Sequence, residues 1–210
     1  MGLMLILAII AALAAILYAR QVKHGASAPV ADKSAALPRS AASGIPAPSE
    51  PPNLLRNPSF DTPSATVPKA AEGWTEVWVG GGKIAVVRDT VVFHTAPASL
   101  SIGSVQGDPN GDVKAQVAQG VGGRHGGERM RLRGFLKTEG TPCVQVAVQA
   151  RRGITPLTLL PAVYRVGAGD WQEFDKVITL PEGTDSVGVC VYIEGKGRAW
   201  LDDAALVSLP

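Results

Sequence analysis

From residue 53 to the C-terminus the chain consists of short apolar segments separated by turn residues, and this pattern most constrains the fold. Apolar and polar side chains alternate within the segments, as in strands that bury one face. Glycine-rich and Asn/Asp-containing turns divide the segments, and no helical period of useful length is present. Many short strands joined by such turns predict an all-β sandwich or barrel. The expected strands are 74–79, 83–88, 98–102, 113–121, 129–138, 143–150, 171–180, 187–194 and 198–207.

The last expected strand, 198–207, places a carboxylate on an apolar face. Asp202 and Asp203 are neighbours, so strict alternation directs them to opposite faces. Burying an ionised carboxylate is costly unless hydrogen bonds, a cation or a metal compensates it. The best-matched partner is segment 53–61, which carries its own acidic residue, Asp61. We therefore expect the two ends of the folded region to lie side by side, held by Asp61 and Asp202.

Several short motifs follow one another between residues 53 and 203. They are Asn-Leu at 53–54 with Asn-Pro-Ser-Phe-Asp at 57–61, Gly73-Trp74, Ser-Leu-Ser-Ile at 99–102, Gln-Gly-Val at 119–121, Trp171 and Trp-Leu-Asp-Asp at 200–203. Taken in this order, they resemble the galactose-binding-like jelly-roll domains, a group that includes the carbohydrate-binding modules of families 4, 9 and 22. The resemblance covers residues 53–209 and implies a two-sheet antiparallel jelly-roll sandwich.

The N-terminal segment is apolar and uncharged from Gly2 to Ala19, at the lower end of the length that crosses a bilayer as a helix. A cleaved signal peptide is the alternative, since Ala26-Ser27-Ala28 fits a small-x-small cleavage site. No Lys or Arg precedes the apolar run, and Pro29 would follow the cut. Residues 1–24 are therefore expected to be an uncleaved, single-pass membrane anchor.

The side of the membrane on which the folded region lies is open to two interpretations. Arg20, Lys23 and His24 follow the apolar run, and the positive-inside tendency favours the cytoplasm for that flank. The family resemblance favours the extracytoplasmic side, which we adopt. Residues 25–52, rich in Ala, Pro and Ser, are expected to be a disordered linker, and residues 53–210 a single domain.

The composition excludes some function classes. The formal net charge is +2, whereas nucleic-acid binders usually carry a concentrated basic face. Catalytic motifs such as HExxH, GxSxG and GxxxxGK[ST] are lacking in the sequence, so an enzyme is not expected. Aromatic residues make up 5% of the chain, which limits the number of surfaces on which a sugar can stack.

Alternation in strands 129–138, 143–150 and 187–194 predicts one apolar face and one polar face. The polar face would carry guanidinium, amide and phenol groups, which suit sugar hydroxyls and C–H faces. In the modules that the chain resembles, this face holds the glycan; a solvated outer face is the alternative. The candidate ligand-binding residues are Arg131, Arg133, Gln145, Gln149 and Tyr192.

The resemblance also implies a structural calcium ion where the first strand meets the last. By position, Asp61 and Asp202 correspond to its acidic ligands, and Asp89 is a possible third. Each also has a structural interpretation, because Asp202 can accept backbone N–H bonds and Asp89 can cap a turn. Cys143 and Cys190 are expected to be unpaired thiols, since jelly-roll order would place strand 129–138 between their strands.

Two hypotheses for function follow. In the first, the protein is a membrane-tethered, non-catalytic module that binds glycan or another cell-envelope polymer through the polar face. In the second, the same sandwich is a structural or accessory subunit that docks on a membrane protein complex.

Overall fold

The computed structural model describes residues 51–105 and 111–210, and this part of the chain is all β. Every strand pair is antiparallel. The strands are β1 (Glu76–Gly81), β2 (Ile84–Asp89), β3 (Ser99–Ser104), β4 (Asp112–Val121), β5 (Arg129–Arg152), β6 (Thr155–Val166), β7 (Gly169–Thr179) and β8 (Ser186–Leu209).

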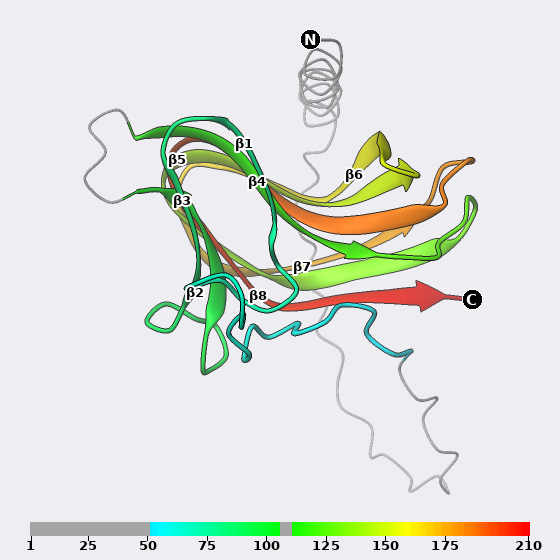
Figure 1. Cartoon of the computed structure of the whole chain (residues 1–210), viewed down its shortest axis with the longest axis horizontal. Coiled ribbons are helices and arrows are strands. Elements are labelled where there is room, and N and C mark those ends of the chain that lie inside the picture. Colours follow the sequence, from blue (N-terminus) through cyan, green and yellow to red (C-terminus); the bar gives the residue numbers. More distant parts are fainter. Residues whose placement is uncertain (1–50, 106–110) are drawn as a thin grey trace, which may run out of the picture. The chain divides into compact units, whose positions relative to one another are not determined.

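The two longest strands, β5 and β8, pair along almost their whole length and organise the rest. Their ladder runs from Arg129 opposite Leu209 to Arg151 opposite Ser186. It bends in the middle, where Gly140 lies opposite Gly197. Gly195, two residues before Gly197 on β8, lies in the same bend. All three glycines have positive φ, which other residues adopt at a cost. Figure 1 shows β8 leaving the upper layer in orange, bending at the left and returning in red to the C-terminus.

The bend folds one curled sheet into two layers. The first layer has the order β1, β4, first half of β8, second half of β5, β6. The second layer has the order β2, β3, second half of β8, first half of β5, β7. Each of the two long strands therefore contributes to both layers, and each layer has an inner and an outer face.

The core fills the space between the layers. Val117, Val146 and Val191 from the first layer and Leu132 and Leu206 from the second are buried in one apolar cluster. Phe60 and Trp74, which precede β1, belong to the same cluster, and their ring centroids are 5.3 Å apart. Because the core side chains occupy alternate positions, the intervening side chains of each strand lie on the outer faces.

A bulge in β8 interrupts the alternation expected for residues 198–207. Asp203 has a φ of 48°, and the β5–β8 register shifts between Arg133 and Phe135. As a result Leu201 and Leu206, which strict alternation would place on opposite faces, both lie in the core.

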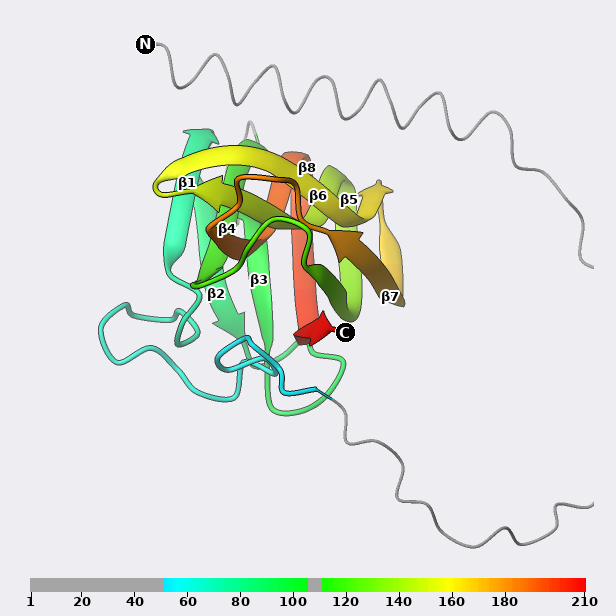
Figure 2. The same cartoon turned by 90° about the vertical axis from the view of Figure 1, so that its right-hand side faces the viewer.

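The two ends of the described region lie side by side, as the sequence predicts. Leu54 N donates to Leu206 O at 2.8 Å, and the Asn53 side chain bonds both Ala204 O (3.0 Å) and Leu206 N (3.0 Å). Figures 1 and 2 both show the first described residues, in cyan, along the C-terminal part of β8. The contact is made by Asn53 and backbone groups, so the prediction that Asp61 and Asp202 hold it was wrong.

The observed strands differ from the expected ones in two ways. Residues 129–138 and 143–150 are parts of the single strand β5, and 187–194 and 198–207 are parts of β8. Strand β6 is not among the expected strands, and Pro156 and Pro161 lie within it. It is an edge strand, and Pro161 lies at a register shift, where a missing N–H is tolerated.

The expected membrane anchor and linker lie almost wholly outside the described residues. In residues 51–105 and 111–210 no helix is long and apolar enough to cross a bilayer. Residues 51–210 form one compact unit.

Candidate functional site

Five polar and aromatic side chains form one row across the outer face of the first layer. Gln116 of β4 lies opposite both Trp78 of β1 and Tyr192 of β8. Gln145 of β5 lies opposite both Tyr192 and Tyr164 of β6. Directly opposed residues share a face, so aromatic and amide side chains alternate across all five strands. All five are partly exposed, and we call them the cross-strand row.

Tyr192 is at the centre of the cross-strand row. Its hydroxyl donates to Glu194 Oε2 at 2.6 Å, and that carboxylate lies 3.6 Å from Lys114 Nζ. Burial, followed by the bond to Glu194, raises the pKa of Tyr192. The phenol therefore remains a neutral hydroxyl throughout the physiological pH range.

Small side chains lie beside the cross-strand row. Ala118, Cys190 and Ala147 lie opposite one another on β4, β8 and β5 and form a small cluster against which Leu159 of β6 packs. Burial raises the pKa of the Cys190 thiol to about 12. This thiol is therefore a packing group and not a nucleophile.

An ion pair borders the face on the far side of the small cluster. Arg151 Nη2 of β5 lies 3.0 Å from Glu76 Oε2 of β1, and Arg151 Nε donates to Gln149 Oε1 at 2.8 Å. The pair reaches across two strands because the intervening residues are Gly120 and Gly188. A Cβ at Gly120 would lie 2.7 Å from Glu76 Oε1, and one at Gly188 would lie 2.9 Å from Arg151 Nη2.

The structure divides the five predicted ligand-binding residues between the two layers. Gln145 and Tyr192 are in the cross-strand row, and Gln149 is on the same face but 5% exposed. Arg131 and Arg133 are in the second layer, opposite Val177 and Asp175 of β7. The prediction that they share a face with Gln145 was wrong, because β5 crosses from one layer to the other between residues 133 and 145.

Arg131 also forms an ion pair with Asp175 in the second layer. Its Nε donates to both carboxylate oxygens of Asp175, at 2.7 and 3.0 Å. The hydrogen bond from Arg131 lowers the pKa of Asp175, against the effect of its burial.

Comparison with known proteins finds similar structures but no similar sequences. No protein-family model and no curated protein sequence matches the chain. A family 61 carbohydrate-binding module in complex with β-1,4-galactotriose aligns with a TM-score of 0.51 and 17% identity, over 75% of this chain and 99% of that one. Family 22 carbohydrate-binding modules from Paenibacillus barcinonensis and Clostridium thermocellum also align. The chain therefore has a jelly-roll fold like that of these galactose-binding-like modules.

The same jelly roll also occurs in enzymes. A Stig cyclase from Fischerella sp. TAU aligns with a TM-score of 0.54 and 12% identity, over 75% of this chain and 97% of that one. The enzymatically active domain of tailspike protein 4 from bacteriophage CBA120 aligns with a TM-score of 0.58 and 12% identity, over 75% of this chain. The chain spans 21% of the tailspike protein. At these identities the likeness shows the fold alone.

The jelly roll does not gather the three carboxylates predicted as calcium ligands. Among residues 51–105 and 111–210, no three His, Cys, Asp or Glu side chains form a group suited to a metal ion. Asp202 is buried, and its oxygens accept the N–H groups of His94 (2.8 Å), Thr95 (3.0 Å) and Asp203 (2.8 Å). Burial raises the pKa of Asp202, although these bonds oppose the shift. Calcium binding itself stays a prediction from the sequence.

Asp89 and Asp61 likewise have structural surroundings of their own. The Asp89 carboxylate accepts the N–H groups of Val91 (2.9 Å) and Val92 (3.1 Å) and Trp200 Nε1 (2.9 Å). The Asp61 side chain is exposed. The structural interpretations of Asp202 and Asp89, a backbone acceptor and a turn cap, are therefore confirmed.

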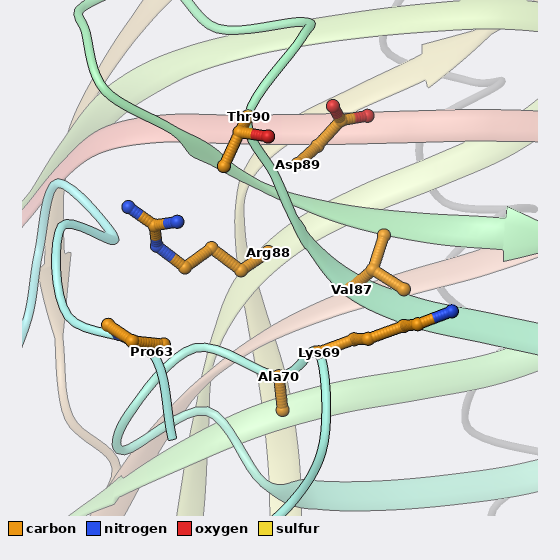
Figure 3. A pocket seen from close by; sticks show the side chains of 7 residues that line it. All are labelled: Pro63, Lys69, Ala70, Val87, Arg88, Asp89 and Thr90. Carbon is orange, nitrogen blue, oxygen red and sulfur yellow. The ribbon is translucent and has the colours of Figure 1, made fainter. Parts of the chain in front are cut away.

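The positive charge next to segment 53–61 is the guanidinium of Arg88. Arg88 Nε donates to Phe60 O at 2.6 Å, and Arg88 Nη2 donates to Asp61 O at 2.9 Å. Arg88 also borders a surface depression of about 320 Å³ with Lys69 and Asp89. Figure 3 shows these three side chains extending in different directions, so their charges do not converge on one ligand position.

The cysteines are unpaired, as expected, but for a different reason. Their strands are direct neighbours: Cys143 lies opposite Glu194, and Cys190 lies opposite Ala147. A four-residue offset along a strand is about 13 Å, beyond the roughly 7 Å that a disulfide bridges. Register, and not an intervening strand, keeps the thiols apart.

Three members of the cross-strand row are not among the predicted ligand-binding residues: Trp78, Gln116 and Tyr164. In the described part of the chain Trp78 and Tyr164 are two of six aromatic residues that are not buried, so residue type alone would have pointed to them without singling them out. Nothing in the sequence places Gln116 opposite Tyr192, because that contact depends on the register of β4 with β8.

Proposed function

We propose that this protein is a non-catalytic jelly-roll sandwich module that binds a polysaccharide, or a related cell-envelope polymer, across the outer face of its first layer. The observation that carries the proposal is the cross-strand row. Its aromatic side chains offer flat apolar surfaces for the C–H faces of sugar rings. Its amides offer both donors and acceptors for sugar hydroxyls.

The spacing of the cross-strand row suits an extended chain lying across the strands. Neighbouring strands are about 4.8 Å apart, so Trp78, Tyr192 and Tyr164 repeat at about 9.6 Å and the whole row spans about 19 Å. A β-linked chain of several sugars can then stack on the aromatic residues and present its hydroxyls to the amides between them.

Two structural neighbours support this ligand class. One is the family 61 module solved with β-1,4-galactotriose, and another is described as a xylan-binding domain. By analogy we propose linear β-1,4-linked polysaccharides as the first ligands to test.

We also propose that residues 2–19 anchor the module in a membrane and that residues 25–52 tether it on the extracytoplasmic side. The apolar, uncharged composition of the first segment supports the anchor, and the Ala, Pro and Ser content of the second supports a flexible tether.

Affinity electrophoresis of the full-length protein through gels containing xylan, β-1,4-galactan, glucan or mannan tests the proposal. We expect retardation in at least one gel. Tyr192→Ala should weaken binding about tenfold, equivalent to about 1.4 kcal/mol, because a central stacking surface and its hydroxyl are lost.

Arg133→Ala is the matched control, since Arg133 lies on the second layer and should leave retardation unchanged. Retardation that survives Tyr192→Ala but is lost in Arg133→Ala would assign binding to the other layer. Absence of binding to all four polysaccharides would contradict the proposal.

A further inference from the structure

A second hollow lies next to the cross-strand row. It has a volume of about 470 Å³ and is lined by Gly80, Gly81, Gly82, Lys114, Glu194 and Gly195, among others. Four of its eight lining residues are glycines, which contribute only backbone to the walls. We call it the glycine pocket.

A bulge at the end of β1 forms the glycine pocket. The β1–β4 register shifts between Val79 and Gly81, which bends the strand. Gly82 has a φ of 74°, and a Cβ there would lie 2.1 Å from Asp112 O. A Cβ at Gly81, in contrast, would meet no atom within 4 Å, so Gly81 faces open space.

The glycine pocket is continuous with the cross-strand row. A Cβ at Gly80 would lie 2.4 Å from Cη2 of Trp78, so the indole ring lies over the backbone of Gly80. The hydrogen bond from the Tyr192 hydroxyl to Glu194 (2.6 Å) and the ion pair between Glu194 and Lys114 (3.6 Å) lead from the centre of the row to the pocket wall. A ligand on Trp78 and Tyr192 would therefore lie at the pocket entrance.

We propose that the glycine pocket receives a side-chain sugar of a branched polysaccharide whose main chain lies on the cross-strand row. The inference rests on the proposed function and adds a preference for substituted over unsubstituted chains. The opposite border of the face is closed to such a branch, because the Glu76–Arg151 ion pair lies over the sheet there.

The polar groups of the pocket define the class of branch. Glu194 supplies an acceptor and Lys114 a donor, and the two form an ion pair. Asp112 is a second acidic residue of the lining, so the pocket carries an excess of negative charge. These groups suit a neutral sugar with several hydroxyl groups. An acidic branch would bring a further negative charge beside Glu194.

Isothermal titration calorimetry of the full-length protein compares a branched polysaccharide with its debranched main chain, using arabinoxylan against linear xylan and galactomannan against linear mannan. We expect tighter binding of the branched member of the pair that binds. Gly81→Leu fills the open space and should weaken branched binding about tenfold, with linear binding changed less than about twofold. Lys114→Met removes the donor, so it should also weaken binding of the branched polysaccharide more than binding of the linear one.

Gly122→Leu is the matched control, because a Cβ at Gly122 also meets no atom within 4 Å but lies outside the pocket. Near-UV circular dichroism verifies that each variant is folded. Equal binding of branched and linear chains by the unmodified protein, or a preference that both pocket variants leave intact, would overturn the inference while the proposed function stands. Absence of binding to every polysaccharide would overturn both.

Discussion

The buried carboxylate of Asp202 is compensated by hydrogen bonds from the backbone. Its oxygens accept three N–H groups, those of His94, Thr95 and Asp203. Two of them come from His94 and Thr95, in the loop between β2 and β3, which therefore lies against β8. The sequence contains no local sign of this partner because the loop is more than 100 residues away from Asp202.

Asp202→Ala should lower the free energy of unfolding by about 3 kcal/mol, because buried N–H groups lose their acceptor. Urea denaturation followed by tryptophan fluorescence measures the change. Asp203→Asn is the control. The Asp203 side chain is 27% exposed and bonds the side chains of His94 and Thr95, and not buried backbone N–H groups. Asn keeps an acceptor oxygen and tolerates the positive φ, so the loss should stay below about 1 kcal/mol. Equal losses in the two variants would contradict the role assigned to Asp202.

Asp89 should give the protein an acid-sensitive contribution to stability. Burial alone would raise the pKa of Asp89, yet hydrogen bonds from Trp200, Val91 and Val92 lower it below the ordinary value of 3.8. The stabilisation is therefore complete above pH 3.8 and is lost as the pH falls through the lowered pKa.

Asp89→Asn should cost about 1–2 kcal/mol at neutral pH, and its difference from the unmodified protein should shrink below pH 3.8. Urea denaturation at a series of pH values measures both. A difference that is independent of pH would show that the ionised carboxylate is not the stabilising species.

The two thiols should differ in reactivity. Cys190 is fully buried with a pKa raised to about 12, whereas Cys143 is partly exposed. Iodoacetamide at neutral pH should therefore modify Cys143 alone in the folded protein and both thiols in denaturant, as counted by mass spectrometry. Rapid modification of Cys190 in the folded protein would show that the small cluster around it opens.

At the scale of elements, the continuity of β5 and β8 was the feature hardest to predict. The sequence predicts a turn at Gly140 between strands 129–138 and 143–150, and both segments are indeed strand. The structure instead uses Gly140, Gly195 and Gly197 to bend a paired ladder without ending it. Local sequence does not distinguish a turn from a bend, because both need positive φ.

Gly197→Ala should destabilise the fold, because a Cβ there would lie 2.0 Å from Glu139 O and the φ of 131° is strained for alanine. We expect a loss of about 2–3 kcal/mol, measured by thermal unfolding. Gly122→Ala, at a position with open space, should cost less than about 0.5 kcal/mol. A stable Gly197→Ala variant would show that the bend is adaptable.

At the scale of the whole molecule, the cross-strand row exists only once five strands are in register. Alternation correctly placed Gln145 and Tyr192 on an outer face, since it requires only a period of two. It also grouped Arg131 and Arg133 with them, because periodicity says nothing about a strand that passes between layers. Trp78, Gln116 and Tyr164 come from strands whose neighbours the sequence does not specify.

Side-chain amide resonances test the central claim most directly. We propose a ¹⁵N NMR titration of the full-length protein with a linear β-1,4-linked oligosaccharide that it binds. The account predicts that the side-chain N–H signals of Gln116 and Gln145 shift on saturation, while that of Asn53, which bonds Ala204 O of β8 in the second layer, stays in place. Shifts in Asn53 without shifts in Gln116 and Gln145 would contradict it.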